Sequence, residues 1–202
     1  VSISRDFMLS AADVAHQAGL DVHLDGARVF NAAVDQGRPA AELTDMVESV
    51  TFCLSKGLCA PVGSVLCGSI AFIEKAHRVR KQLGGGMRQA GVLAAAGIVA
   101  LEEMADRLSE DHDHAKALAE GLGALPGVHL EKGSPNTNMV YIALGPETGL
   151  DAKRCSDSLR EQGVLAGITG PRHFRLVCHY WIRDEHIPKV IQAFSNVLEA
   201  AK

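Results

Sequence analysis

The chain has 202 residues, 47% of them hydrophobic and 22% charged, which is the balance of a globular protein long enough to bury a core. Its net charge of −4 argues against a basic face for nucleic acid, and no apolar run reaches the roughly 18 residues of a membrane span. The five cysteines have no CxxC spacing, so we interpret them as buried thiols in a reducing compartment.

The first residues, Val1 to Ser4, resemble the end of a strand and show neither a secretion signal nor a transit-peptide pattern. We therefore expect the chain to be a fragment or a truncated product. We expect the protein in the cytoplasm. The mitochondrion is the alternative, because a targeting segment would precede Val1.

Apolar periodicity and turn residues predict alternating helices and strands. The predicted helices cover residues 8–18 (capped by Ser10), 29–35, 39–46, 70–83, 87–109, 111–122, 151–162 and 185–201. The predicted strands cover residues 20–25, 49–54, 64–68, 128–130, 139–144, 164–168 and 174–177. The strand–helix alternation favours an α/β fold with a largely parallel sheet. A composition change near Gly123 predicts a larger domain over residues 1–123 and a small α+β domain over residues 124–202.

The stretch 51–64 leads four mostly apolar residues into Ser55-Lys56-Gly57. If this strand carries Lys56 into a pocket, burial lowers the pKa of the amine and makes it a nucleophile. The alternative is a loop lysine with its ammonium group in water. The stretch alone leaves both interpretations open.

Asp25 ends the strand at 20–25, and ligands of open α/β sheets bind at the carboxyl ends of parallel strands. The alternative role of Asp25 is to cap the next helix. Asp25 and Lys56 are about one strand–helix–strand crossover apart, so we expect both at the same sheet edge. Pyridoxal phosphate enzymes use this pair, since a lysine forms the Schiff base and an aspartate keeps the ring nitrogen protonated. Arg28 and Arg175 are candidate anchors for a substrate carboxylate, although a lone Arg175 is more often a surface residue.

Three motifs, taken together, resemble the low-specificity L-threonine aldolases, which are fold-type I pyridoxal phosphate enzymes. They are His23-Leu24-Asp25-Gly26-Ala27-Arg28, the Ser55-Lys56-Gly57 segment through Ser64, and Gly84-Gly85-Gly86-Met87-Arg88-Gln89. The resemblance runs the whole length of the chain. It implies the C-terminal part of such a fold, with a partial, mostly parallel sheet belonging to the cofactor-binding domain and a small α+β domain.

The resemblance implies that Lys56 forms the Schiff base with pyridoxal phosphate and that Asp25 pairs with the pyridine nitrogen. It also implies that Arg28 and Arg175 hold the carboxylate of an amino-acid substrate. The implied reaction is the retro-aldol cleavage of L-threonine or L-allo-threonine to glycine and acetaldehyde. The alternatives are a truncated, catalytically incompetent product that acts at most as a subunit partner, and another fold-type I lyase for a related amino acid.

By the same resemblance, Arg88 supports the cofactor phosphate or the active site, and Lys81 reaches the entrance of a neighbouring subunit's site. The alternative for Arg88 is a helix-start residue that binds local carbonyl groups. The family implies a homotetramer, a dimer of dimers whose subunits complete each other's sites. We expect no metal, nucleic-acid or membrane partner. The resemblance also implies that the residues that bind the phosphate and stack on the ring lie outside this chain, together with a histidine that handles the hydroxyl proton of the substrate. We do not expect His23 or His179 to replace that histidine.

Overall fold

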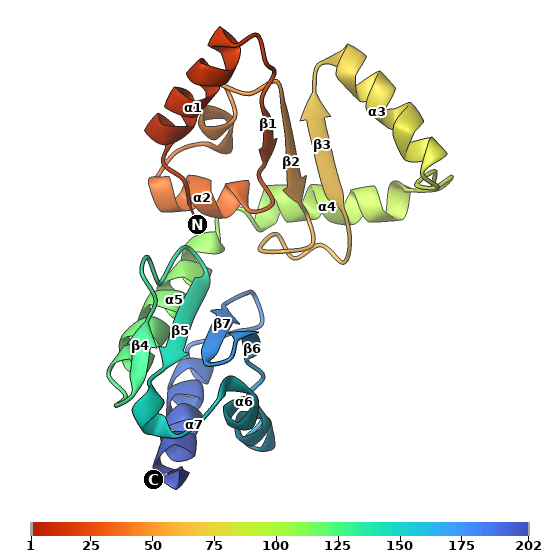
Figure 1. Ribbon diagram of the computed structural model, residues 1–202. Coiled ribbons are helices and arrows are strands. Elements are labelled where there is room, and N and C mark those ends of the chain that lie inside the picture. Colours follow the sequence, from red (N-terminus) through yellow and green to blue (C-terminus); the bar gives the residue numbers. More distant parts are fainter. Residues whose placement is uncertain (1, 202) are drawn as a thin grey trace. The chain divides into compact units, whose positions relative to one another are not determined.

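The computed structural model describes residues 2–201 and divides them into two compact units (Figure 1). The N-terminal unit is Ser2–Leu108, and the C-terminal unit begins at Ser109. This division precedes the boundary predicted at residue 123, because helix α5 (Leu108–Gly123) packs into the C-terminal core through Leu118 and Leu122.

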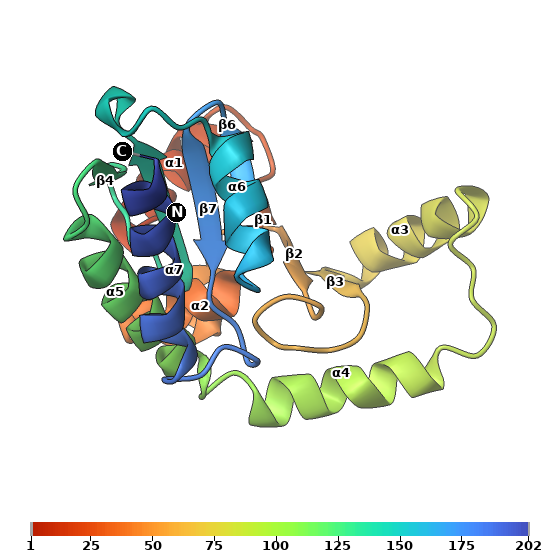
Figure 2. The same ribbon diagram turned by 90° about the horizontal axis from the view of Figure 1, so that it is seen from below.

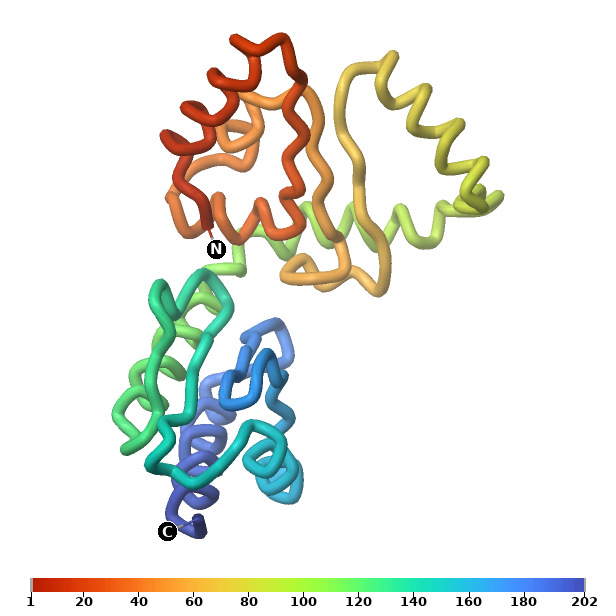
Figure 3. Tube along the Cα trace, in the orientation of Figure 1, coloured from red at the N-terminus to blue at the C-terminus, as the bar shows by residue number. Residues whose placement is uncertain are grey.

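The N-terminal unit contains a three-stranded sheet in the order β1-β2-β3. Its strands are β1 (His23–Asp25), β2 (Ser49–Cys53) and β3 (Ser64–Gly68). β1 and β2 are parallel, and the crossover between them through α2 (Val29–Gln36) and a 3-10 turn (Ala40–Leu43) can be followed in Figure 3. β2 and β3 are antiparallel. The sheet is therefore mixed and not largely parallel, because a loop without a crossover helix joins β2 to β3.

Three further helices, α1 (Arg5–Gln17), α3 (Ile70–Gln82) and α4 (Gly91–Glu103), complete this unit. The predicted cap Ser10 lies inside α1 and donates to the carbonyl oxygen of Asp6 at 2.9 Å, whereas Ser4 is the N-cap. The single helix predicted over 87–109 is shorter, because the chain turns after Glu103 and buries Leu108 completely in the N-terminal core.

Side chains of the N-terminal sheet alternate between two faces. On one face Phe52 and Val65 pack against a cluster that contains Leu54 and Ala100, so this face is covered. The opposite face carries His23 and Asp25, whose side chains are exposed. The covered face fixes the sheet, and the other face presents polar groups.

The C-terminal unit contains an antiparallel sheet in the order β4-β5-β7-β6. Its strands are β4 (Val128–Leu130), β5 (Met139–Leu144), β6 (Gly167–Gly170) and β7 (His173–Val177). Helices α5, α6 (Ala152–Glu161) and α7 (His186–Ala200) lie on one face of the sheet, and a short 3-10 turn (Pro146–Thr148) follows β5 (Figures 1 and 2). The strand predicted at 164–168 begins only at Gly167. Val164 instead closes the end of helix α6, because its N–H donates to the carbonyl oxygen of Leu159. The expected compact α+β arrangement is confirmed here.

Candidate active site

Asp25 and the loop of Lys56 leave the N-terminal sheet at the same edge. In the parallel β1–β2 pair, Asp25 stands opposite Thr51. The pairing continues beyond β1, since the N–H of Gly26 donates to the carbonyl oxygen of Thr51 at 2.8 Å. β2 then ends at Cys53, just before Lys56. The predicted placement at the carboxyl edge of two parallel strands is confirmed.

The loop that carries Lys56 is pressed against α2. The N–H of Cys59 donates to the carbonyl oxygen of Lys56 at 2.9 Å, which closes a tight turn. At Gly57, a Cβ atom would lie 2.8 Å from both Asn31 Oδ1 and Leu108 Cδ2, so only glycine fits without displacement. Because Asn31 belongs to the helix that follows Asp25, this contact ties the Lys56 loop to the Asp25 edge.

Lys56 is exposed in the described chain, and so is Asp25. Leu54, Leu58 and Ala60 turn inward and are at most 8% exposed, which leaves Lys56 on the outer side of the loop. The buried-pocket interpretation of residues 51–64 is therefore wrong for these residues, and the loop-lysine alternative describes them.

Arg28 is the N-cap residue of α2, a position that the sequence had offered to Asp25. Its side chain is half-buried, and the N–H of Ala32 donates to its carbonyl oxygen at 3.1 Å. Arg28 is thus fixed by the first turn of a helix that starts at the same sheet edge as Asp25.

The face of Asp25 also carries a hydrogen-bonded set that sequence reasoning missed. Nδ1 of His23 lies 2.9 Å from Ser49 Oγ, and Nε2 lies 3.3 Å from Thr51 Oγ1. The period-two alternation of a strand places His23 on the face of Asp25, but the partners on β2 depend on the strand register.

Lys81 and Arg88 lie at the junction of α3 and α4 and are exposed. The segment between these helices extends away from the carboxyl ends of β1 and β2 in both views of the unit (Figures 1 and 2). Lys81 folds back over the glycine run, since a Cβ atom on Gly86 would lie 2.8 Å from Lys81 Nζ. The N-terminal unit therefore does not bring Lys81 or Arg88 to Lys56.

Arg175 lies on β7 in the C-terminal unit, where it pairs with Tyr141 of β5 and Gly167 of β6. Its side chain is exposed, whereas its strand neighbours Phe174 and Leu176 are buried. The strand therefore presents Arg175 on the face opposite to the core.

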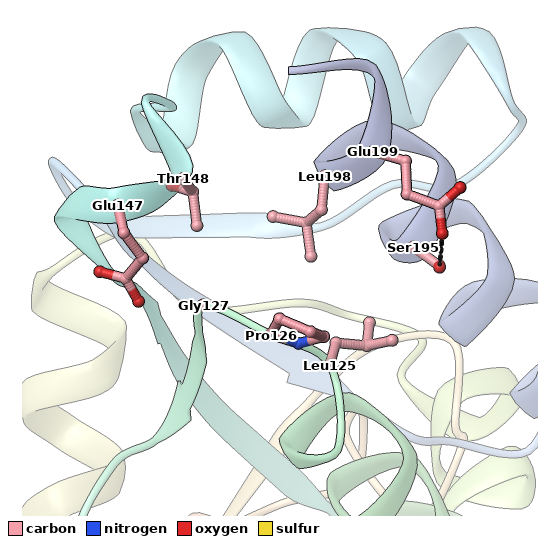
Figure 4. Close-up of a pocket in the computed structure, with 8 residues that line it drawn as sticks. All are labelled: Leu125, Pro126, Gly127, Glu147, Thr148, Ser195, Leu198 and Glu199. Atoms are coloured by element: carbon pink, nitrogen blue, oxygen red, sulfur yellow. Dashed lines mark hydrogen bonds between the residues drawn. The ribbon is translucent and has the colours of Figure 1, made fainter. Parts of the chain in front are cut away.

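The C-terminal unit also contains a cavity of about 140 Å³ between the 3-10 turn and α7 (Figure 4). Glu147 and Glu199 contribute carboxylates to its wall, and Ser195 Oγ donates to Glu199 Oε1 at 3.2 Å. None of the predicted site residues lines this cavity. Within residues 2–201, no group of three or more metal-ligating side chains occurs, and no helix is long and apolar enough to cross a membrane.

The residue types at the sheet edge fit pyridoxal phosphate. Lys56 offers an accessible primary amine, and Asp25 offers a carboxylate from the adjacent parallel strand. The pyridine ring of the cofactor, bound at this edge, would have the Lys56 amine for covalent attachment and the Asp25 carboxylate beside its ring nitrogen. The cofactor requires both groups.

The family profile of the beta-eliminating lyases matches residues 2–144, a range that includes Asp25, Lys56 and Arg88. The chain belongs to the beta-eliminating lyase family. Low-specificity L-threonine aldolase 1 of Arabidopsis thaliana is 40% identical to this chain over 196 residues, covering 97% of this chain and 55% of the relative. The chain spans about half the length of the curated relatives it matches.

Solved structures show the same fold. A protein of Exiguobacterium sp. 255-15, named as an aromatic amino acid beta-eliminating lyase/threonine aldolase, has a TM-score of 0.83 at 22% identity, with 98% of this chain and 58% of that chain covered. Leishmania major threonine aldolase has a TM-score of 0.76 at 15% identity, covering 97% and 57%. The expected fold-type I architecture and the resemblance to threonine aldolases are confirmed.

Proposed function

We propose that this beta-eliminating lyase family member serves the retro-aldol cleavage of L-threonine or L-allo-threonine to glycine and acetaldehyde. The observation that carries the proposal is the placement of Asp25 and Lys56 at one sheet edge, one crossover apart. The name of the Arabidopsis relative supports the same activity. In this reaction the Cα–Cβ bond breaks, the hydroxyl oxygen loses its proton to become the aldehyde carbonyl, and Cα gains a proton to become glycine.

Each predicted residue has a distinct part in this proposal. Lys56 would hold the cofactor covalently through its amine and would release it to the amine of the substrate. Asp25 keeps a proton on the ring nitrogen, because an anion there stabilises the ring cation. Bound pyridoxal phosphate supplies the sink for the electron pair of the broken bond. Arg28 and Arg175 bind the substrate carboxylate and hold the bond that breaks in its reactive orientation.

The proposed form is a homo-oligomer, a dimer of dimers, in the cytoplasm. Lys81 lies in the last turn of α3 and Arg88 lies between α3 and α4, and in the proposed oligomer this part of a partner subunit supplies Arg88 to the site of Lys56. Leu83 and Val92 beside this segment are more than four-fifths exposed, and Met87 is 63% exposed, as expected of a surface that another subunit covers. The five cysteines are free, which suits a reducing compartment.

Cofactor attachment is the first test. The protein is incubated with pyridoxal phosphate, reduced with borohydride and digested, and the modified peptide is identified by mass spectrometry. We expect the label on Lys56, no label in K56A, and an unchanged label in the control K75A, whose lysine lies exposed on α3. A label on Lys75 or on no lysine would contradict the proposed role of Lys56.

Product analysis then separates the alternatives. Glycine release is measured from threonine, allo-threonine and phenylserine with the cofactor bound. Release from the first two supports the proposal. A labelled Lys56 without any glycine release favours the catalytically incompetent subunit, and release from phenylserine alone favours another lyase of the same fold.

Mixing of variants tests the shared site. If Arg88 serves the Lys56 of a partner, K56A and R88A are each inactive, but a reassociated mixture regains part of the activity. Sedimentation equilibrium gives the subunit number of both variants as a control. A mixture that stays inactive although mixed oligomers form would show that Arg88 does not act across the subunits.

A further inference from the structure

The exposed face of the N-terminal sheet carries one hydrogen-bonded set that the proposed reaction does not use. His23 contacts Ser49 Oγ through Nδ1 at 2.9 Å and Thr51 Oγ1 through Nε2 at 3.3 Å. Ser49 stands opposite His23 in the register, and Thr51 stands opposite Asp25. The imidazole therefore lies along β2, with its Nε2 end directed to the residue beside Asp25.

This arrangement engages both ring nitrogens at the same time. A hydroxyl group both donates and accepts, so Ser49 and Thr51 satisfy the imidazole in its neutral and its charged form. Ser49 is only 8% exposed, which makes the Nδ1 contact the anchored end. The Nε2 end then fixes the Thr51 hydroxyl.

Fixing this hydroxyl also fixes the surroundings of Asp25. Threonine is branched at Cβ, so a bond from its hydroxyl selects one of its χ1 rotamers. Neighbouring strands lie about 4.8 Å apart, within contact reach of two short side chains on one face. The register thus makes Thr51 the residue of β2 that stands opposite Asp25, on the same face of the sheet.

We propose that His23 is a positioning residue for Asp25, acting through Thr51, so that the carboxylate presents its oxygen to the ring nitrogen of pyridoxal phosphate. The inference rests on the proposed function, because it assumes that Asp25 meets this ring. His23 lies two residues before Asp25, behind the carboxyl edge, and orients the carboxylate without touching the cofactor.

Two amide substitutions separate the ends of the imidazole. The amide of H23N reaches the position of Nδ1 and so replaces only the Ser49 contact, whereas the amide of H23Q reaches the position of Nε2 and keeps the Thr51 contact. T51V removes the hydroxyl at constant shape, and T51S keeps it. S49A is the matched control, because it removes the hydroxyl that is remote from Asp25.

The cofactor dissociation constant is measured by titration of each refolded or native variant, and the protonation of the ring nitrogen is followed by ¹⁵N NMR with labelled pyridoxal phosphate. We expect H23N and T51V to bind about tenfold more weakly, the effect of one charge-assisted hydrogen bond, with the ¹⁵N signal moved toward the unprotonated ring. H23Q, T51S and S49A should stay within about twofold of the wild type.

Equal cofactor dissociation constants of H23N and H23Q would overturn the positioning role of His23, and so would an unchanged ¹⁵N signal in T51V. Either result would leave the proposed function intact. If the wild-type protein binds no pyridoxal phosphate at Lys56, the proposed function fails first, and this inference fails with it. Unfolding midpoints of all five variants show whether a loss of affinity comes from a loss of fold.

Discussion

The two units bury their apolar residues in different ways. In the C-terminal unit one continuous cluster contains Phe174, Phe194 and Ile142, each at 0% exposure. The N-terminal unit instead has two smaller clusters. Its helix α4 is apolar all round, yet only Gly97 and Ala100 are buried within the described chain. The C-terminal unit therefore buries its own core, whereas the N-terminal unit displays one apolar helix, α4, that a further contact can bury.

This difference coincides with the placement of the candidate chemistry. The N-terminal unit presents Asp25 and Lys56 on an exposed edge, above a single covered sheet face. The C-terminal unit presents Arg175 on the outer face of a closed core. Stability and chemistry are thus separable by mutation, more cleanly in the C-terminal unit than in the N-terminal one.

The largest effect is expected from a substitution that disrupts the C-terminal core. Phe174 packs edge-to-face on Phe194, with ring centroids 5.9 Å apart. F174A should lower the free energy of unfolding by about 3–5 kcal/mol, because it removes a large ring from a filled core. V14A is the contrast, since Val14 of helix α1 is 69% exposed, and its effect should stay within about 0.5 kcal/mol. Urea unfolding measures both variants, and a large cost of V14A would show that α1 is covered in solution.

The reactivity of the cysteine thiols is a second way to compare the closed core of the C-terminal unit with the N-terminal unit. Burial raises the pKa of Cys155 to about 11, and burial together with the nearby charge of Asp111 raises the pKa of Cys178 to about 12. Because the thiolate is the nucleophile, Cys155 should react about 100-fold and Cys178 about 1000-fold more slowly at neutral pH than an accessible cysteine of ordinary pKa. Cys67 of the N-terminal sheet is exposed and should be alkylated first.

Peptide mapping after timed treatment with iodoacetamide measures these rates. In urea all three cysteines should react alike, which controls for local sequence effects. Alkylation of folded Cys155 as fast as that of Cys67 would contradict the closed core of the C-terminal unit.

The sequence predicted the local elements better than their junctions. Alternation located β5 and β7, because a half-buried strand carries its own pattern. The helix predicted over 87–109 was too long, because Met104, Ala105 and Leu108 continue its apolar pattern past Glu103, while the turn there depends on the burial of Leu108 by distant residues. Packing of this kind leaves no local signal.

The candidate site divides in the same way. The shared edge of Asp25 and Lys56 was predictable, because a parallel crossover has a characteristic length. The exposure of Lys56 stayed open between a pocket and a solvated loop, since it depends on a loop in which Cys59 adopts a left-handed φ of 63°. The His23 contacts required the register, and the place of Arg88 required the three-dimensional course of the α3–α4 segment. The catalytic roles of these residues remain predictions.

A smaller effect is expected from a methyl group at the Lys56 loop. G57A places a Cβ atom 2.8 Å from Asn31 Oδ1 and Leu108 Cδ2, so the loop or α2 must move. Overpacking of this kind costs about 1–3 kcal/mol, and the displaced loop should also slow cofactor attachment at Lys56. G91A is the control, because nothing lies within 4 Å of a Cβ atom there. Thermal unfolding and the borohydride label measure the two effects, and normal labelling of G57A would show that the loop adapts without moving Lys56.

The smallest effect concerns two helix caps, one in each unit. Asp151 caps α6 by accepting from the N–H of Arg154 at 2.8 Å, and α6 buries Cys155 and Leu159. D151A should therefore cost about 1 kcal/mol in the global unfolding of the C-terminal unit. Ser69 caps α3 by accepting from the N–H of Phe72 at 3.3 Å, but α3 has no buried residue in the described chain.

Because α3 is so weakly packed, loss of its cap should fray the helix locally instead of lowering the global stability. Hydrogen exchange should then speed up across residues 70–82 in S69A, with an unchanged urea midpoint, whereas D151A should shift the midpoint. If S69A shifts the midpoint as much as D151A, α3 unfolds together with its sheet. The N-terminal unit would then unfold as cooperatively as the C-terminal unit, although its apolar residues are less well buried. If only the hydrogen exchange of residues 70–82 changes in S69A, helix α3 can unfold locally, and its order depends on a contact with another surface.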